Sequence, residues 1–502
     1  MLHPLTRAAR GGFAIIFMFG CSAGGGGDTS RPAPPGGSVD GSPSGGVLPP
    51  RAGGSGSGSG SGASALPPAS SAAGGGLAAA GGSGSVVTEP GLGNVQLDPN
   101  ELPPRALALR ADGYLDLAPA RGEAFDRTQG TILNPPAPAG YTWYPVPGTS
   151  CRDGSEAGLF LRFTDSKRLL IFFEGGGACT STGFCNFNPK NVNQVLAGTG
   201  ETVLGSALGA VAGRQQPGVY QNNELSGVFS ADRIENPFHD WNIAYIPYCT
   251  GDVHAGSRRA ASVPGVAEAQ KFVGFLNTQT FVGRLVPTFA AGLERVVVTG
   301  ASAGSFGAAL NFSMISDAFA GVQTDAILDS GVPFEDQFWP TCLQKSWREL
   351  FGLNYGLPPD CEQCFHEDGG GLIGLSDFLI AKHPTAHIAL ISSMQDEVIR
   401  LFFTPGENNC ATLATADPVG ITLGQLAGAQ IFPAATYEAG LLGVRSKYQA
   451  TGRMASFFLA QANVTLHQHT MRPRFFDAAL GTVSMAAFVN NFLNGRMEQV
   501  GP

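Results

Sequence analysis

Short apolar runs, recurring along the chain from about residue 105, constrain the fold more than any other feature of this sequence. They are rich in β-branched and aromatic residues, and the stretches between them are long enough to hold helices. The runs are Arg168 to Phe173, Trp241 to Pro247, Arg295 to Thr299, Ala326 to Asp329, His387 to Ser392 and Asn463 to Leu466. Continuous apolar runs of this length fit buried parallel strands, although periodicity alone does not exclude buried helical segments.

Helical candidates alternate with these runs, and the clearest are Ala303 to Phe319 and Thr482 to Leu493. Alternating strands and helices predict an α/β fold, in which helices cover both faces of a mostly parallel central sheet. We expect one catalytic domain over residues 106–502. Insertions near 186–235 and 335–380 could shape a lid or a substrate wall.

The N-terminus has the pattern of a targeting segment. Arg7 and Arg10 precede the apolar run from Phe13 to Phe19, which is followed by Gly20 and Cys21. The run is too short to cross a bilayer as a helix, because spanning takes roughly 20 apolar residues. The pattern therefore predicts a signal peptide over residues 1–20.

The ending of this segment, Met18-Phe19-Gly20-Cys21, resembles a bacterial lipoprotein signal, in which the cysteine is lipidated and becomes the new N-terminus. We expect Cys21 to anchor the protein by lipid in the bacterial cell envelope, at the outer membrane; a plain secretory signal is the alternative. Residues 21–105 are mostly Gly, Ser, Pro and Ala, a composition that stays disordered. They predict a flexible tether with an end-to-end distance of roughly 50 Å.

The charge balance excludes one class of partner. The net charge is −9, only 14% of the residues are charged, and no cluster of Lys or Arg interrupts this pattern. A nucleic-acid-binding protein needs a basic surface, so we expect no nucleic acid partner. We expect the protein to be a monomer.

The nine cysteines point to an oxidising compartment. If Cys21 carries lipid, an even set of eight remains for up to four disulfides, whose pairing the sequence does not give. These are Cys151, Cys179, Cys185, Cys249, Cys342, Cys361, Cys364 and Cys410. A zinc site built on Cys361, Cys364 and His366, with Cys342 nearby, is the alternative, which the absence of a second close C-x-x-C pair disfavours.

The strongest motif is Gly300-Ala301-Ser302-Ala303-Gly304. It follows the β-rich run Arg295 to Thr299 and precedes a helical stretch of small residues. G-x-S-x-G alone is a weak pattern, and a tight turn with a spectator serine is the simpler interpretation. Between a strand and a helix, however, it is typical of a nucleophile elbow, which exposes the serine on a strained turn. The pattern predicts Ser302 as a nucleophile.

A serine hydroxyl needs a base to take its proton, and the base needs an orienting acid. In a fold of this kind the order along the chain is Ser, acid, His. Asp396 follows the run His387 to Ser392 and is the predicted acid. Asp329 ends an earlier run and is the reserve acid, although a structural role fits it better.

Two histidines could act as the base. His467 and His469 both follow the last predicted strand, and at i and i+2 of an extended segment they could share a face. Their spacing therefore does not separate them. His254 precedes Ser302 in the chain, and we interpret it as a pocket or structural residue.

Acyl transfer also needs hydrogen-bond donors aimed at the oxyanion. Glu174-Gly175-Gly176-Gly177 follows the first predicted strand, and its glycines can turn backbone N–H groups towards a substrate. Its natural partner is the N–H of Ala303, the residue after the nucleophile. A plain flexible turn is the alternative. A phosphate-binding loop is disfavoured because no G-K-[ST] follows.

Taken together, the motifs resemble the pectin acetylesterase/Notum family of carboxylesterases. The matching pieces are F-F-E-G-G-G-A-C (Phe172 to Cys179), D-W-N-I-A-Y-I-P-Y-C-T-G-D-V-H-A-G (Asp240 to Gly256), T-G-A-S-A-G (Thr299 to Gly304), L-D-S-G (Leu328 to Gly331), S-M-Q-D (Ser393 to Asp396) and H-T (His469, Thr470) before Phe475 and Phe476. The resemblance covers roughly residues 150 to 495. It implies an α/β-hydrolase-like fold that uses no cofactor and no metal, in an exported, disulfide-bonded bacterial member.

The resemblance also implies roles for single residues. Ser302 matches the nucleophile and Asp396 the acid. His469 matches the base better than His467, because in bacterial relatives a threonine directly follows the histidine. The oxyanion-hole positions are matched by Gly176, Gly177 and Ala303.

The chain departs from the family at Ala301 and Ser305, where the family usually has Cys and Gly, and neither change removes chemistry. Ala178 stands where the family commonly carries an aromatic residue, so we expect a wider or reshaped pocket there. Plant members act on acetylated pectin, and the animal member removes a fatty acyl group from a protein. The resemblance therefore does not give the substrate.

We expect a serine carboxylesterase that acts on acyl esters, with O-acetyl groups of a polysaccharide as the first candidate. A lipid, long-chain or polyester acyl group is the alternative substrate. An alternative of another class is a catalytically silent surface binding protein that has kept the fold.

Overall fold

The computed structural model of this chain describes residues 122–131, 133, 140–196, 226–411, 431–460 and 467–502. The signal peptide expected at 1–20, the lipidation expected at Cys21 and the tether expected at 21–105 lie outside the described residues. So does the strand expected at Asn463 to Leu466.

Within the described residues, the main sheet has nine strands in the order β1-β2-β4-β3-β7-β8-β9-β10-β13. Their bounds are Thr142–Ser150 (β1), Glu156–Arg162 (β2), Arg168–Phe173 (β3), Asn242–Ile246 (β4), Arg295–Ala301 (β7), Gln323–Asp329 (β8), Ile388–Ser393 (β9), Met454–Leu459 (β10) and Gln499–Val500 (β13). The strands from β4 to β13 run parallel, while β2 is antiparallel to both β1 and β4. The carboxyl ends of the parallel strands therefore meet at one edge of the sheet.

Two short two-stranded sheets stand apart from the main one. The first pairs β5 (Arg258–Ala261) with β6 (Gln270–Phe272), and the second pairs β11 (Ala479–Leu480) with β12 (Val483–Ser484).

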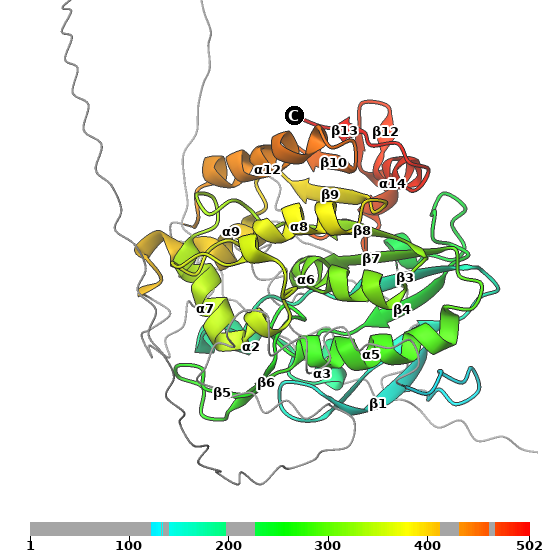
Figure 1. Ribbon diagram of the computed structural model, residues 1–502, viewed down its shortest axis with the longest axis horizontal. Helices are drawn as coiled ribbons and strands as arrows, with labels where there is room; N and C mark the ends of the chain where they lie inside the picture. Colours follow the sequence, from blue (N-terminus) through cyan, green and yellow to red (C-terminus); the bar gives the residue numbers. More distant parts are fainter. Residues whose placement is uncertain (1–121, 132, 134–139, 197–225, 412–430, 461–466) are drawn as a thin grey trace, which may run out of the picture. The chain divides into compact units, whose positions relative to one another are not determined.

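Helices cover both faces of the main sheet, as the sequence predicts. The main ones are α5 (Gly274–Phe289), α6 (Ala303–Ala318), α7 (Thr341–Phe351), α8 (Gly374–Lys382), α9 (Glu397–Phe403), α12 (Ala434–Gln449) and α14 (Met485–Leu493). Figure 1 shows α6, α8 and α12 along one face of the sheet. On β10, Phe458 lies under Arg445 of α12, and its neighbour Phe457 packs against Phe488 of α14. Because successive strand residues point to opposite faces, α14 covers the other face.

Shorter helical segments lie in the connections. They are α2 (Thr182–Phe187), α3 (Val192–Leu196), α13 (Arg474–Asp477) and the 3₁₀ turns Gly227–Phe229, Leu353–Tyr355, Glu362–Cys364 and Thr404–Asn408. Within the part of the chain that the structure describes, no helix combines the length and the apolar character needed to cross a bilayer.

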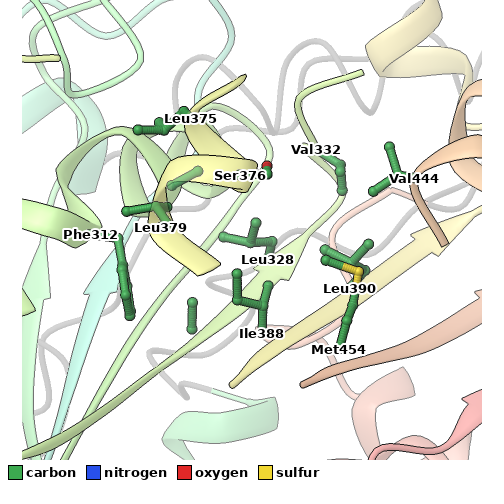
Figure 2. A pocket seen from close by; sticks show the side chains of 12 residues that line it. Phe312, Leu328, Val332, Leu375, Ser376, Leu379, Ile388, Leu390, Val444 and Met454 are labelled. Carbon is green, nitrogen blue, oxygen red and sulfur yellow. The ribbon is translucent and has the colours of Figure 1, made fainter. Parts of the chain in front are cut away.

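A small cavity lies between the sheet and the helices that cover its α6 side (Figure 2). Apolar side chains from α6, α8, β9 and β10 line it, including Phe312, Leu379, Leu390 and Met454. The Ser376 hydroxyl also lies at its wall. With so few polar groups, the cavity has the character of a gap in core packing.

All eight cysteines after Cys21 are paired, which confirms the predicted set of disulfides. The pairs are Cys151–Cys249, Cys179–Cys185, Cys342–Cys410 and Cys361–Cys364. A cysteine binds zinc as a thiolate, and a disulfide sulfur no longer offers one. The alternative of a zinc site on Cys361 and Cys364 is therefore wrong for this structure.

Candidate active site

Ser302 lies on a tight turn between β7 and α6, with φ 59° and ψ −124°. A non-glycine residue in this region is strained by about 1–3 kcal/mol, as is typical of a nucleophile elbow. The turn needs glycine on both sides. A Cβ on Gly300 would lie 2.2 Å from the Gly304 carbonyl oxygen, and one on Gly304 would lie 2.0 Å from the Phe173 carbonyl oxygen. The five-residue motif thus lets α6 approach β3 closely while it turns Ser302 out of the strand.

The acid candidate Asp396 caps the N-terminus of α9, directly after β9. Its Oδ1 accepts hydrogen bonds from the amides of Val398 and Ile399, both at 3.0 Å. Its Oδ2 lies 2.8 Å from Nδ1 of His467. Asp396 is fully buried and His467 nearly so, which excludes water from the pair. The helix cap therefore fixes one carboxylate oxygen and leaves the other to orient an imidazole.

The two base candidates point in different directions. The ring of His469 does not reach Asp396: its Nε2 lies 3.3 Å from Oγ of Ser393, and its backbone amide donates to Asp329. The expectation that His467 and His469 share a face assumes an extended backbone, and this is wrong because the residue between them, Gln468, has φ 58°. That positive φ turns one ring towards Asp396 and the other away from it.

The environment of His469 also differs from that of a base near neutral pH. Burial lowers the pKa of His469 well below its ordinary value of 6.5, and the neighbours Arg474, His467 and Arg472 lower it further. Its imidazole is therefore neutral in the folded protein. The carboxylate contact that orients a catalytic base belongs to His467, whose Nδ1 lies 2.8 Å from Asp396.

The reserve acid Asp329 lies at the carboxyl end of β8, next to the nucleophile strand. Its carboxylate accepts hydrogen bonds from the backbone amides of His469 and Thr470 and from the hydroxyls of Thr470 and Ser330. These donors are amides and hydroxyls, in contrast to the imidazole that contacts Asp396. The Asp329 carboxylate thus binds the backbone amides of the segment that carries the two histidines, and not a histidine ring.

The glycine loop after β3 is held by its carbonyl groups. Asn188 Nδ2 donates to the carbonyl of Gly176, and the Tyr248 hydroxyl donates to that of Gly177 at 2.7 Å. In a trans peptide the N–H points opposite to the C=O of the same unit. The amides of Gly177 and Ala178 are therefore directed away from Asn188 and Tyr248. Gly177 has φ 80°, which glycine adopts without strain.

His254 also contacts the glycine loop. Its Nε2 lies 2.7 Å from the Glu174 carbonyl oxygen, so this nitrogen carries the proton and donates. The ring is buried between Phe173 and Tyr248. Burial lowers the pKa of His254 to about 4, which keeps the imidazole neutral. His254 thus contacts the loop that carries Gly176 and Gly177.

The surroundings of Ala178 contain aromatic residues from elsewhere in the chain. Ala178 is buried and forms an isolated β-bridge with Asp252. Phe402 of α9 stacks on Phe184 of α2 with ring centroids 4.7 Å apart. It lies so close to the glycine loop that a Cβ on Gly177 would come within 2.5 Å of its ring. Aromatic surface therefore borders the glycine loop although residue 178 is alanine.

Sequence reasoning missed the residues that hold the glycine loop. Asn188 belongs to no motif, and Tyr248 falls within a matched motif without an assigned role. Both act through backbone carbonyls that are far away in the sequence, 12 residues for Asn188 and 71 for Tyr248. Tyr248 follows the end of the buried strand β4, whereas Asn188 ends the short helix α2 and has no such signal in the sequence.

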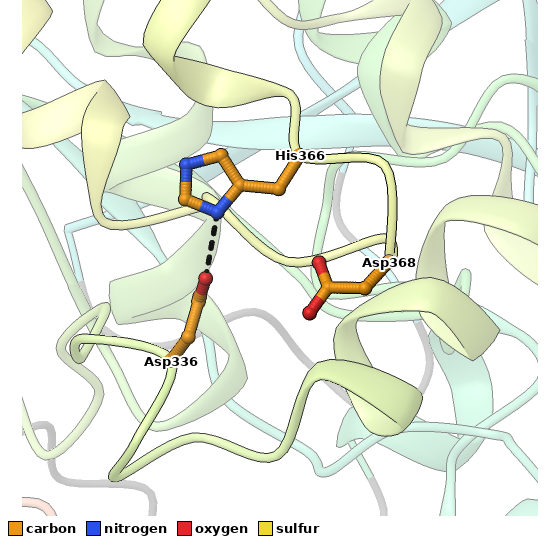
Figure 3. Close-up of side chains that lie close together, drawn as sticks. All are labelled: Asp336, His366 and Asp368. Carbon is orange, nitrogen blue, oxygen red and sulfur yellow. Dashed lines mark hydrogen bonds and ion pairs between the residues drawn. The ribbon is translucent and has the colours of Figure 1, made fainter. Parts of the chain in front are cut away.

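A second cluster of ligand-type side chains lies in the 335–380 insertion (Figure 3), where Asp336, His366 and Asp368 come close together. Asp336 Oδ2 contacts Nδ1 of His366 at 2.8 Å, and its Oδ1 accepts from the Gly371 amide. Asp368 accepts from the Gly370 amide. Through these hydrogen bonds the two carboxylates hold the 366–371 loop in place, which is a structural role.

Residues 144–367 match the family model described as Pectinacetylesterase. Over this span the chain is similar to the pectinacetylesterase family. The family resemblance predicted from the motifs is thereby confirmed. The matched span contains the glycine loop and Ser302, whereas Asp396 and His467 lie beyond it.

Known proteins similar to this chain are palmitoleoyl-protein carboxylesterases. The notum1' protein of Xenopus laevis is 29% identical over 236 residues, which are 43% of this chain and 44% of that protein. The NOTUM protein of Drosophila melanogaster is 27% identical over 235 residues, 43% of this chain and 31% of that protein. The chain thus spans less than half the length of these curated relatives.

A solved structure of the Wnt deacylase Notum from Drosophila also overlaps this chain. The overlap covers 71% of this chain and 93% of that one, with 17% sequence identity and a TM-score of 0.45.

Proposed function

We propose that this protein is a serine carboxylesterase that uses Ser302, His467 and Asp396. The observation that carries the proposal is the 2.8 Å contact between Nδ1 of His467 and Asp396. The three residues also follow one another along the chain in the order Ser, acid, His. His467 replaces His469, which the resemblance favours, because the ring of His469 contacts Ser393 instead.

The contacts suggest how each group would act. A carboxylate accepts, so Nδ1 of His467 carries the proton and Nε2 keeps a lone pair for the proton of Ser302. Ser302 Oγ attacks the ester carbonyl while His467 takes this proton. His467 then returns the proton to the leaving alcohol, and the acyl group remains on Ser302. Water, deprotonated by His467, releases the acid and restores the serine.

The oxyanion that forms during attack needs hydrogen-bond donors, and we propose the amides of Gly176, Gly177 and Ala303. Ala303 is the first residue of α6, and its N–H is one of those that a helix leaves without a partner in the preceding turn. The contact of Asn188 with the Gly176 carbonyl directs the amide of Gly177, and the contact of Tyr248 with the Gly177 carbonyl directs the amide of Ala178. Each such donor lowers the barrier by roughly 3 kcal/mol.

A fluorophosphonate probe tests the proposal, because it modifies only an activated serine. We expect the folded protein to be labelled at Ser302 and to hydrolyse p-nitrophenyl acetate. Ser302→Ala should abolish labelling and lower kcat by about 10⁴-fold or more. A folded protein without labelling would instead support a silent binding protein.

For the substrate we propose an acyl ester with a small acyl group, with O-acetyl on a polysaccharide as the first candidate. The match to the pectinacetylesterase family supports acetyl esters. The relatives' description as palmitoleoyl-protein carboxylesterases supports a long acyl chain as the second candidate. Rates on p-nitrophenyl esters from acetyl to palmitoyl distinguish the two: a maximum at acetyl or propionyl supports the first, and a maximum at long chains the second.

We also propose that the protein is exported as a monomer. The four disulfides support an oxidising compartment, because cytosolic thiols are kept reduced. A lipid at Cys21, a signal peptide at 1–20, a tether at 21–105 and a catalytic domain at 106–502 complete the proposal. Mass spectrometry of the mature N-terminal peptide tests the anchor, since lipidation adds acyl mass to Cys21 and Cys21→Ala removes it.

A further inference from the structure

Asp329 contacts both segments of the candidate active site. Its backbone carbonyl accepts the amide of Ser302 at 2.8 Å. Its carboxylate Oδ2 accepts three hydrogen bonds from the segment after His467: the His469 amide at 2.7 Å, the Thr470 amide at 2.6 Å and the Thr470 hydroxyl at 2.7 Å. One fully buried residue thus connects the nucleophile turn to the histidine segment.

Ser330 extends this connection to the residue next to His467. Its hydroxyl donates to Asp329 Oδ1 at 2.9 Å and accepts the amide of Gln468 at 3.0 Å. The amide of Ser330 itself donates to Ile391 of β9 at 2.8 Å. Asp329 and Ser330 therefore hold the amides of all three residues that follow His467, and Gln468 is the residue whose positive φ turns the ring.

The donors around Asp329 fit a side chain whose role is to accept hydrogen bonds. Burial raises the pKa of Asp329, and the hydrogen bonds from Thr470, His469 and Ser330 oppose this rise. The guanidinium of Arg474 is near enough for Asp329 and Asp396 to raise its pKa, although burial lowers that pKa to about 10 overall. A cation therefore accompanies the two buried carboxylates.

We propose that Asp329 is a positioning residue, which fixes His467 relative to Ser302 by accepting hydrogen bonds from the 468–470 backbone. The inference rests on the proposed function. Asp329 acts through the loop, whereas Asp396 contacts the imidazole directly. A displacement of about 1 Å between reacting groups costs about 10²-fold in rate, so loss of this support lowers kcat.

Asparagine separates a support role from an acid role. An asparagine at 329 can present its oxygen to the donors on His469 and Thr470. Its NH₂ then faces the Ser330 hydroxyl, which accepts as well as donates. At an acid that orients the base, the same change costs about 10⁴-fold in kcat. A support role therefore predicts that Asp329→Asn keeps most of the activity, whereas an acid role predicts that Asp329→Asn loses most of it.

The experiment compares Asp329→Asn, Asp329→Ala and Asp396→Asn by kcat and KM on p-nitrophenyl acetate. We expect Asp329→Asn to stay within about tenfold of the parent kcat, and Asp329→Ala to lose about 100-fold or more. KM should change by less than about threefold in both, because the acyl pocket is untouched. Asp396→Asn should fall lowest.

Asp325→Ala is the matched control. Asp325 is a buried carboxylate on the same strand, four residues before Asp329, and pairs with Arg295 at 3.2 Å away from the site. The Asp325→Ala substitution should lower the free energy of unfolding but leave kcat unchanged. The low-field proton resonance of the His467–Asp396 hydrogen bond supplies a second readout, which should persist in Asp329→Asn and weaken in Asp329→Ala.

Two results would overturn the inference: Asp329→Asn as inactive as Asp396→Asn, or a folded Asp329→Ala with the parent kcat. If Asp329→Ala does not fold, Thr470→Val and Ser330→Ala decide, since each removes one hydroxyl of the same network. A lower kcat at unchanged KM in either supports the inference, and the parent kcat in both overturns it. If the parent protein hydrolyses the ester, either of these results contradicts the role of Asp329 alone. If the parent protein hydrolyses no ester, the proposed function itself is overturned.

Discussion

At the scale of single residues, the backbone angle of Gln468 decides between two histidines. With φ 58° it separates the rings of His467 and His469, so that only one of them contacts Asp396. Sequence patterns carry the spacing of side chains but not this angle, because the tertiary contacts of Asp329 and Ser330 impose it. The resemblance therefore favours the histidine before threonine, while the geometry favours the one two positions earlier.

The base assignment gives the first prediction. His467→Ala should lower kcat on p-nitrophenyl acetate by about 10⁴-fold, because Ser302 would lose its proton acceptor. His469→Ala removes a neutral ring that contacts Ser393 and should cost less than about 100-fold. Steady-state kinetics on the two purified variants measures the difference. The reverse order of activity would return the base role to His469.

His254 gives a prediction about acid stability. Its pKa is lowered from 6.5 to about 4 in the folded protein, so only the unfolded chain takes up this proton between those values. The stability from the neutral ring is present above pH 6.5 and is lost as the pH falls towards 4. As the pH falls through this range, the free energy of unfolding of the parent should drop by roughly 3 kcal/mol more than that of His254→Gln.

Asp252, two residues earlier, is the control with the opposite sign. Burial raises the pKa of Asp252 from 3.8 to about 6. Its contribution is therefore complete below pH 3.8 and is lost as the pH rises through 6. Asp252→Asn should make the decline on acidification steeper, where His254→Gln makes it shallower. Urea unfolding between pH 4 and 7 measures both, and equal slopes in all three proteins would contradict the assignment.

At the scale of elements, the parallel strands were predictable and the antiparallel edge was not. β3, β4, β7, β8 and β9 are buried on both faces, so they read as continuous apolar runs and coincide with five of the predicted ones. β1 contains exposed positions and two prolines, and no run marks it. β10 has the buried Ser456 in its middle, whose hydroxyl donates to Gln499. This polar residue interrupts the apolar run, so the pattern does not mark β10 as a strand.

The close approach of α6 to β3 predicts opposite effects for two glycine substitutions. In Gly304→Ala the new Cβ would meet the Phe173 carbonyl at 2.0 Å. Backbone would have to move, and we expect a loss of about 3 kcal/mol or more. Gly443 lies within α12 with 3.5 Å to its nearest neighbour, so Gly443→Ala should gain about 0.5–1 kcal/mol. Denaturant unfolding measures both, and a neutral Gly304→Ala would show that the elbow tolerates a side chain.

At the scale of the whole molecule, the disulfides differ in how much chain they close. Cys151–Cys249 closes 98 residues and Cys361–Cys364 only 3. Because a longer closed loop restricts the unfolded chain more, replacing the first pair by serine should cost about 2–5 kcal/mol and the second clearly less. Melting curves of the two double variants test this order. Equal losses would show that local packing outweighs chain restriction.

The pairing pattern has a consequence for how the molecule is made. The disulfides form two nested sets, 179–185 inside 151–249 and 361–364 inside 342–410, and none connects one set to the other. Eight cysteines allow 105 pairings, but four allow only three. A chain that enters an oxidising compartment N-terminus first can therefore complete the first set before Cys342 arrives. The order of emergence thus reduces one large sorting problem to two small ones.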